Sequence, residues 1–320
     1  MTGESYLRLM SDRLPLLVTS NLPQLKPSLA PPSESITKTD NLDNFPWEAG
    51  TAFISYGLQI GIRVNDPDVL IGLLDYLPPG WEPSPLPVVD KLYSLIVGSG
   101  NQYHLLYDEE GELERTTELD GVLHALDSHL RLWIGASVQD LLFVHAGVVA
   151  WHNRAIVIPG RSFSGKTTLV AALVKAGATY YSDEYAVFDT NGLVHPYPRP
   201  LSVRQGKRDM PPARWRDRIR TCPVTELGGK SGTKPLSVGL ILSAQYQSGA
   251  QWHPSLISPG EALLALLDNT IVARIRPQFA LSILAVVVSD TLAIQAKRGE
   301  AQDVAVALLQ QLEQWLIANS

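Results

Sequence analysis

The sequence predicts an α/β protein in two parts, a small α+β domain followed by a larger domain of strands and helices. Three observations lead to this prediction. Residues 47–140 contain short apolar runs separated by Pro, Gly and acidic turns, and end in one helical pattern. Residues 156–177, "IVIPGRSFSGKTTLVAALVKAG", join an apolar run to a helix through a glycine-rich turn. Of the 320 residues 45% are hydrophobic and 18% are charged, an ordinary globular composition that can bury a core.

Residues 1–46 are predicted to form a flexible Pro-rich arm. Six prolines fall between residues 15 and 46 among Ser, Thr, Asn and Asp, a composition that removes backbone donors and adds little buried area. Residues 47–140 follow as a small α+β domain whose role the sequence does not indicate. Its closing helix, predicted at 119–138, carries five apolar side chains at helical spacing: Val122, Leu123, Leu126, Leu130 and Leu132.

Charge and cysteine content exclude several classes of protein. The formal net charge of −6 and the pI near 5.7 predict neither a nucleic-acid partner nor an anionic membrane partner. Cys222 is the only cysteine, so neither an intrachain disulfide nor a thiol zinc cage can form.

The amino terminus lacks the basic start and the apolar segment of a signal peptide. The longest apolar stretch, 279–288, is about half of the ~20 residues that a membrane-spanning helix requires. We therefore expect a cytoplasmic protein.

Residues 141–320 form the second predicted domain, built around the glycine-rich turn. Two β-rich runs before that turn flank His152 and Asn153, a pair suited to a hairpin. The helix after the turn ends at Gly177, where a left-handed cap is expected. Residues 178–189 and 191–204 are predicted to be further strands, joined by an Asn-Gly turn.

The last third of the chain begins with a basic segment. Residues 205–235 hold eight Lys or Arg against three acids and have no periodicity, which predicts a mobile basic loop. A buried strand follows at 234–246, and Ser258, Pro259 and Glu261 predict a helix opened by a capping box. The carboxyl end predicts an amphipathic helix at 301–317 with one apolar side: Val304, Leu308, Leu312, Trp315 and Leu316.

The glycine-rich turn fits the phosphate-loop pattern GxxxxGK[ST], with a strand before it and a helix after it. Its glycines let successive backbone N–H groups converge on phosphate at a helix start, where unpaired donors and the helix dipole favour anions. The lysine reaches the β- and γ-phosphates, and the following threonine hydroxyl ligates magnesium. The predicted nucleotide-binding residues are Gly160, Arg161, Ser162, Phe163, Ser164, Gly165, Lys166, Thr167 and Thr168.

Phosphate chemistry also needs a carboxylate that binds metal or accepts a proton. Asp183 and Glu184 supply a pair at the end of a strand-like run, seventeen residues after Lys166. Paired acids at a strand end are more often a solvated turn, but at this distance from a phosphate loop we interpret them as functional. His145 begins the other flanking strand and is a further candidate, although a lone histidine is more often structural.

Residues 142–247 resemble the catalytic domain of HPr kinase/phosphorylase, a bacterial P-loop kinase that phosphorylates a serine of a small carrier protein. The matched succession is "HAG" from His145 before a hairpin, "GRSFSGKT", a helix ending in Gly177, and "YYSDEYAVFD". The segment "CPVTELGGKSGTKPLSVGLILSA" is similar to the family's substrate loop and the buried strand after it.

This resemblance implies a nucleotide-binding domain of the phosphoenolpyruvate-carboxykinase-like type. It also implies that Asp183 is the base that accepts the hydroxyl proton, that Glu184 acts on the metal side, that His145 lies near the γ-phosphate, and that the protein forms homo-oligomers. The sequence departs from the family at Glu184, where Asp is usual, at the bulky Phe163, and at residues 199–206, "RPLSVRQG", which stand where a glycine-rich metal-binding segment is expected. We therefore expect a diverged member that acts on a substrate other than HPr.

Two functions remain open from the sequence. The first is an ATP- and Mg²⁺-dependent kinase that uses Asp183, His145 and Lys166 to transfer the γ-phosphoryl group to a hydroxyl of a protein or peptide, with serine as the expected acceptor. The second is a nucleotide-gated binding protein, in which ATP orders the basic loop for a partner without phosphoryl transfer. Only the kinase needs a base at Asp183.

Overall fold

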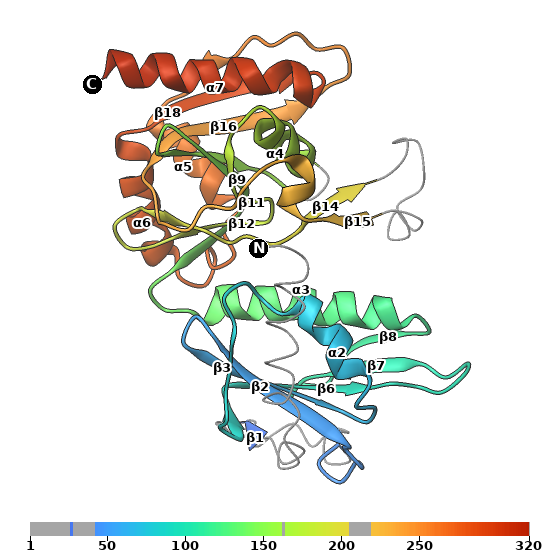
Figure 1. The fold of residues 1–320 in the computed structure, drawn as a ribbon. Helices are drawn as coiled ribbons and strands as arrows, with labels where there is room; N and C mark the ends of the chain where they lie inside the picture. Colours follow the sequence, from blue (N-terminus) through green and yellow to red (C-terminus); the bar gives the residue numbers. More distant parts are fainter. Residues whose placement is uncertain (1–25, 28–41, 162–163, 205–218, 320) are drawn as a thin grey trace. The chain divides into compact units, whose positions relative to one another are not determined.

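The protein is a mixed α/β protein in two compact units, residues 1–138 and 139–320. The computed structural model describes residues 26–27, 42–161, 164–204 and 219–319 (Figure 1). Each unit has its own sheet. Among the helices of these described residues, none is long and apolar enough to span a bilayer.

The first unit is built on a six-stranded sheet of order β4-β2-β3-β6-β7-β8. β2 and β3 form a hairpin, and the turn residues Tyr56 and Gly57 both have positive φ, as a tight hairpin turn requires. The strands are β2 (Ala49–Ser55), β3 (Leu58–Val64), β4 (Glu82–Pro83), β6 (Lys91–Ile96), β7 (His104–Tyr107) and β8 (Glu112–Thr116).

The helix predicted at 119–138 is confirmed as α3 (Leu119–Ser137), and the shorter α2 (Val69–Leu73) continues into the 3₁₀ helix η3 (Leu74–Tyr76). Of the five apolar side chains expected on the buried face of α3, four are buried. The prediction is wrong for Leu132, because its side chain is exposed. Residue 132 lies only two positions after Leu130, and residues two apart do not share a helix face.

The predicted arm lies largely outside the described residues. Where it is described, it contacts later residues of the first unit: β1 (Lys26–Pro27) pairs in parallel with β5 (Val88–Val89), and the Asp43 carboxylate accepts from the Arg63 guanidinium at 3.2 Å. These contacts attach the arm at two points.

The second unit contains an eight-stranded mixed sheet of order β13-β12-β9-β10-β16-β18-β17, with β11 also paired to β9. β9 and β10 are antiparallel, whereas β10, β16 and β18 run parallel. The strands are β9 (Leu142–Trp151), β10 (Arg154–Pro159), β11 (Thr179–Ser182), β12 (Tyr185–Phe188), β13 (Val194–His195), β16 (Val238–Tyr246), β17 (Ser255–Leu256) and β18 (Leu292–Arg298).

Three turn and cap features predicted in the second unit are confirmed. His152 and Asn153 turn the β9–β10 hairpin, with φ of 47° and 60°, the left-handed pair of a tight hairpin. Ser258 and Glu261 form the expected capping box at the start of α5 (Pro259–Leu267). Gly177 follows α4 (Lys166–Lys175) with φ of 106°, and its N–H and that of Ala178 bond back to the last turn of the helix.

Helices cover both faces of this sheet (Figure 1). α4 and α7 (Ala301–Ala318) pack on one face in a common core with β9, β10, β16 and β18. α5 and α6 (Pro277–Ser289) pack on each other, and α5 lies against β16 and β18 on the opposite face. In α7 the expected side chains Val304, Leu308 and Leu312 are buried. The remaining two, Trp315 and Leu316, are only partly buried at its carboxyl end.

The prediction of one mobile basic loop over 205–235 is wrong for its second half. Residues 205–218 lie outside the described residues, but β15 (Ile219–Cys222) pairs with β14 (Leu201–Arg204), and η6 (Val224–Leu227) follows. Gly232 lies against Tyr181, where a Cβ would come within 2.1 Å of the ring. The order in residues 219–235 comes from contacts with distant residues, which is why the sequence there shows no helical or strand periodicity.

Candidate functional site

The glycine-rich turn connects β10 to α4 at the edge of the sheet where the parallel strands β10, β16 and β18 end. A Cβ on Gly160 would lie 2.9 Å from Ser164 Oγ, so the turn folds closely back on itself at this position. Gly165 immediately precedes α4 with φ of 88°, a conformation that favours glycine. The turn therefore delivers the first N–H groups of α4 to the sheet edge.

Lys166 is the first residue of α4, and its side chain turns back over the loop. Its Nζ donates to the carbonyl oxygens of Gly160 at 2.6 Å and Arg161 at 2.9 Å. Only 7% of Lys166 is exposed. The ammonium is therefore held at the head of the helix by the loop backbone, and a positive charge is fixed there.

Asp183 and Glu184 lie at a kink between β11 and β12, both of which pair with β9. The prediction of one continuous strand over 178–189 is wrong. The strand pairing with β9 is interrupted at Asp183 and Glu184, between the end of β11 and the start of β12. The buried Ser182 explains the break: its Oγ accepts from the N–H groups of Glu184 at 3.0 Å and Tyr185 at 2.9 Å. This local bonding competes with the strand ladder and turns the two carboxylates out of it.

The Asp183 carboxylate is buried in a ring of hydrogen-bonding groups. Its Oδ1 lies 2.9 Å from the Tyr180 hydroxyl, its Oδ2 accepts from the Ser202 N–H at 3.4 Å, and the Thr167 side chain lines the same cavity. Burial raises the pKa of Asp183 and the charge of Glu184 adds to this rise, whereas the hydrogen bonds lower the pKa; the net direction is upward. A carboxylate with a raised pKa is a stronger base than an exposed one.

His145 and Glu184 face each other across β9 and β12. Residue 145 is opposite Tyr185 in the β-ladder, and His145 Nε2 lies 3.8 Å from Glu184 Oε1. Backbone hydrogen bonds connect β9 to the acid pair and to the glycine-rich turn. The Ala146 N–H donates to the Glu184 carbonyl, and the Gly160 N–H donates to the His145 carbonyl. The loop, the acid pair and the histidine are therefore fixed to one strand, β9.

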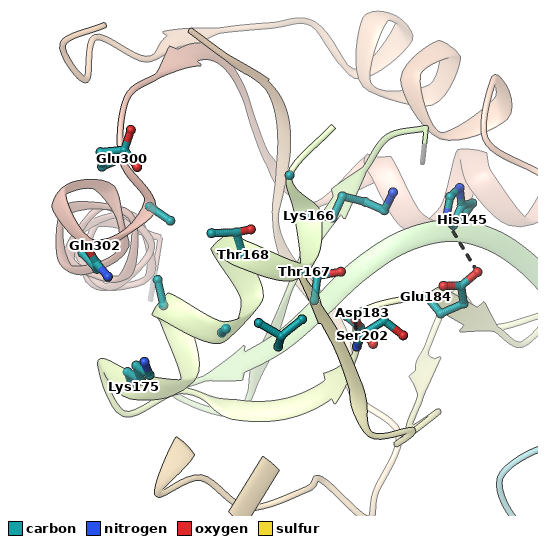
Figure 2. Close-up of a pocket in the computed structure, with 15 residues that line it drawn as sticks. His145, Lys166, Thr167, Thr168, Lys175, Asp183, Glu184, Ser202, Glu300 and Gln302 are labelled. Atoms are coloured by element: carbon teal, nitrogen blue, oxygen red, sulfur yellow. Dashed lines mark hydrogen bonds and ion pairs between the residues drawn. The ribbon is translucent and has the colours of Figure 1, made fainter. Parts of the chain in front are cut away.

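A cavity of about 330 Å³ joins these groups, which is near the lower end of the range of about 300 to 1,000 Å³ for small-molecule sites. Figure 2 shows Lys166, Thr167, Asp183, Glu184 and His145 on one side of it. Of the other predicted residues, Gly165 and Thr168 also line it. Gly160 and Arg161 contribute their carbonyls to Lys166, and Ser164 borders a smaller neighbouring cleft. Ser162 and Phe163 lie outside the described residues.

The residues present fit a bound phosphate and a hard cation. The left-handed Gly165 directly precedes α4, so the amino terminus of this helix lies beside the fixed ammonium of Lys166, a combination suited to phosphate. Thr167, Asp183 and Glu184 offer hydroxyl and carboxylate oxygens, the donors that magnesium prefers. Within the described part of the chain, no three His, Cys, Asp or Glu side chains cluster as metal ligands.

Sequence reasoning missed four residues that shape the site: Tyr180, Ser182, Ser202 and Arg298. Arg298 ends β18 and is 2% exposed, and its Nη2 donates to the Gly165 carbonyl at 2.8 Å. The residues are 133 positions apart, so no local pattern connects them. The role of Ser182 could have been predicted from the sequence, because a serine directly before an acid pair can bond the following backbone N–H groups and form a turn.

Comparison with models of known protein families gave no match, and no curated protein matched the chain significantly.

Asp183→Asn is expected to stabilise the protein in the absence of nucleotide and magnesium. Because the folded-state pKa of Asp183 is raised above 3.8, the folded protein binds its proton more tightly than the unfolded chain, and stability falls as pH rises above that value. Asn carries no charge, and its amide can donate to the Tyr180 hydroxyl. At pH 7 we expect a gain on the order of 1 kcal/mol, or a melting temperature about 2–4 °C higher.

Thermal unfolding between pH 5 and pH 8 tests this expectation. The advantage of Asp183→Asn should shrink as the pH is lowered, because protonation of the parental carboxyl removes the buried charge. Glu184→Gln is the comparison variant: its side chain is 32% exposed and its charge raises the pKa of Asp183 less than burial does, so its melting temperature should rise by less than that of Asp183→Asn. A variant that melts below the parent at pH 7 would contradict the assignment of Asp183 as a buried, unfavourable charge.

Proposed function

We propose that the second unit is an ATP- and Mg²⁺-dependent kinase of the P-loop type that transfers the γ-phosphoryl group to a hydroxyl of a protein or peptide, with serine as the expected acceptor. The observation that carries this proposal is the buried Asp183 carboxylate, which lines the same cavity as Lys166 and Thr167. A phosphate-binding loop alone would support binding; a base beside it supports transfer.

Each side chain has a distinct task in this proposal. Lys166 and the N–H groups at the start of α4 offset the negative charge of the phosphates. Thr167 and Glu184 would hold magnesium, which, when bound, neutralises charge on the β- and γ-oxygens. His145 faces Glu184 and would lie beside the transferred group. Tyr180 and the Ser202 N–H keep the Asp183 carboxylate in place.

The transfer step balances with these groups. The acceptor oxygen forms a bond to the γ-phosphorus while the bond from that phosphorus to the β–γ bridging oxygen breaks, and ADP leaves. Asp183 accepts the hydroxyl proton, and its raised pKa makes it a better acceptor near neutral pH. Asp183 is only 6% exposed, which limits contact between its carboxylate and solvent.

The phosphoenolpyruvate-carboxykinase-like fold belongs to the same proposal. An antiparallel strand, β9, stands beside β10, the strand that leads into the loop, and this arrangement supports it. The resemblance to HPr kinase/phosphorylase adds homo-oligomers to the proposal, and the departures at Glu184 and Phe163 favour an acceptor other than HPr. A cytoplasmic location is proposed from the single cysteine and the sequence of the amino terminus.

Incubation of the protein with γ-labelled ATP, magnesium and cell lysate tests the kinase directly. We expect label in a protein or peptide that is stable to acid and is released by alkali, as expected for serine or threonine phosphate. Asp183→Asn is the control, and it should leave the acceptor unlabelled. Tight ATP binding with neither a labelled acceptor nor free phosphate would overturn the kinase and support the nucleotide-gated binding protein.

A further inference from the structure

The cavity is longer than the phosphate chemistry requires. Beyond Thr167, α4 lines it with Thr168, Ala171, Ala172 and Lys175, which recur at the spacing of one helix face. Lys166 and Lys175 are the first and last residues of α4, so the helix rises about 13 Å between them. The cavity therefore continues along α4, away from Asp183 and Glu184.

The opposite wall of this second half is the start of α7. Glu300, Ala301 and Gln302 line it, and in Figure 2 Glu300 and Gln302 lie with Lys175 on the side of the cavity away from His145. Ala301 is 4% exposed and belongs to the core, whereas Glu300 and Gln302 are exposed. Glu300 Oε1 accepts from the Tyr246 hydroxyl at 2.7 Å, which fixes its carboxylate.

One buried side chain connects the two walls. Arg298 donates to the carbonyl of Gly165, directly before α4, and to the carbonyl of Gly299 at 3.1 Å, two residues before α7. Its guanidinium carbon also lies 5.3 Å from the centre of the Tyr246 ring. A buried guanidinium with these contacts holds the phosphate loop and the start of α7 in one arrangement.

The chemistry of this second half differs from that of the first. Ala171, Ala172 and Ala301 give it aliphatic surfaces, and the polar groups of Lys175, Glu300 and Gln302 stand around them. Such a site suits a flat ring with a polar edge. A carboxylate accepts from hydroxyl or amino donors, and a glutamine amide both donates and accepts, as in its pairing with adenine.

We infer that the half of the cavity between α4 and the start of α7 takes the nucleoside part of the nucleotide. This inference rests on the proposed function, because the phosphates must then occupy the half at Lys166 and Thr167. Glu300 accepts a hydrogen bond from the nucleoside, and Ala171 lies under it as part of the aliphatic floor. The first half alone suffices for inorganic phosphate chains.

Calorimetry with two probes, Mg-ATP and Mg-tripolyphosphate, separates the halves. Ala171→Leu should weaken ATP binding by about tenfold or more, because a larger side chain fills the floor, and leave tripolyphosphate unchanged. Glu300→Gln should weaken ATP binding by about three- to tenfold, the value of one hydrogen bond, without weakening tripolyphosphate. Ala265→Leu, at a half-buried alanine of α5 outside the cavity, is the matched control and should change neither affinity.

The outcomes distinguish this inference from the function on which it rests. If the parent binds both probes but Ala171→Leu and Glu300→Gln alter neither, or alter both equally, the nucleoside site is wrong while the phosphate site stands. If the parent binds tripolyphosphate as tightly as ATP, the nucleoside contributes nothing and the inference is also wrong. If the parent binds neither probe, the proposed function fails together with the inference.

Discussion

Asp183→Asn is expected to lower phosphoryl transfer by about 10² to 10⁴ while ATP affinity stays within a small factor of the parent. The acceptor hydroxyl must lose its proton as the new bond forms, and Asp183 is the buried carboxylate of the cavity that Lys166 and Thr167 also line. Asn keeps the size and hydrogen bonding of the side chain but removes its basicity. The loss corresponds to roughly 3 to 5 kcal/mol of barrier. Single-turnover transfer and calorimetry on the same samples measure both quantities.

Glu184→Gln is the matched carboxylate control for this experiment. If Glu184 acts on the metal side, the variant should need more magnesium for half-maximal transfer and should recover rate as magnesium is raised. Asp183→Asn should not recover. Transfer at the parental rate by Asp183→Asn would remove Asp183 as the base and, with it, the main reason for preferring a kinase over a nucleotide-gated binding protein.

Lys166→Ala is expected to damage binding and transfer together. Its ammonium is fixed at the head of α4 by two loop carbonyls, and charge-assisted hydrogen bonds to phosphate would be lost with it. We expect ATP affinity to fall by about 10- to 100-fold. Transfer should fall further, by about 10² to 10³ at saturating ATP, because the ammonium also stabilises charge that develops during transfer.

Lys234→Ala is the control for the loss of a positive charge, since Lys234 is exposed and lies outside the cavity. It should bind ATP as the parent does. If Lys166→Ala binds ATP with parental affinity, the glycine-rich turn is not the phosphate site, and both the kinase and the nucleotide-gated alternative lose their common basis.

Local signals in the sequence were sufficient wherever the structure depends on near neighbours. The hairpin at His152–Asn153, the capping box of Ser258 and Glu261, and the left-handed Gly177 were all predicted and all confirmed. In each case a side chain or a backbone angle acts within a few residues of itself, so its position along the chain carries the information. The same reason accounts for the predicted strand, glycine-rich turn and helix at 156–177.

Contacts between distant residues accounted for most of what the sequence left out. The order in residues 219–235 comes from pairing with β14 and from close packing of Gly232 on Tyr181, which no periodicity records. The exposure of Leu132 could have been predicted from helical spacing alone. The break between β11 and β12 had a local signal in Ser182, but its effect depends on both strands pairing with β9.

By itself, the sequence determined the α/β class, the glycine-rich turn between strand and helix, and the acid pair seventeen residues after Lys166. Only the tertiary structure decided that Asp183 is buried among Tyr180, Thr167 and Ser202, because its pKa depends on solvent exclusion by residues that the chain gathers from three segments. The structure also decided that Arg298 reaches Gly165 across the ends of parallel strands. Burial and long-range hydrogen bonds are properties of the packed chain, and a linear pattern does not encode them residue by residue.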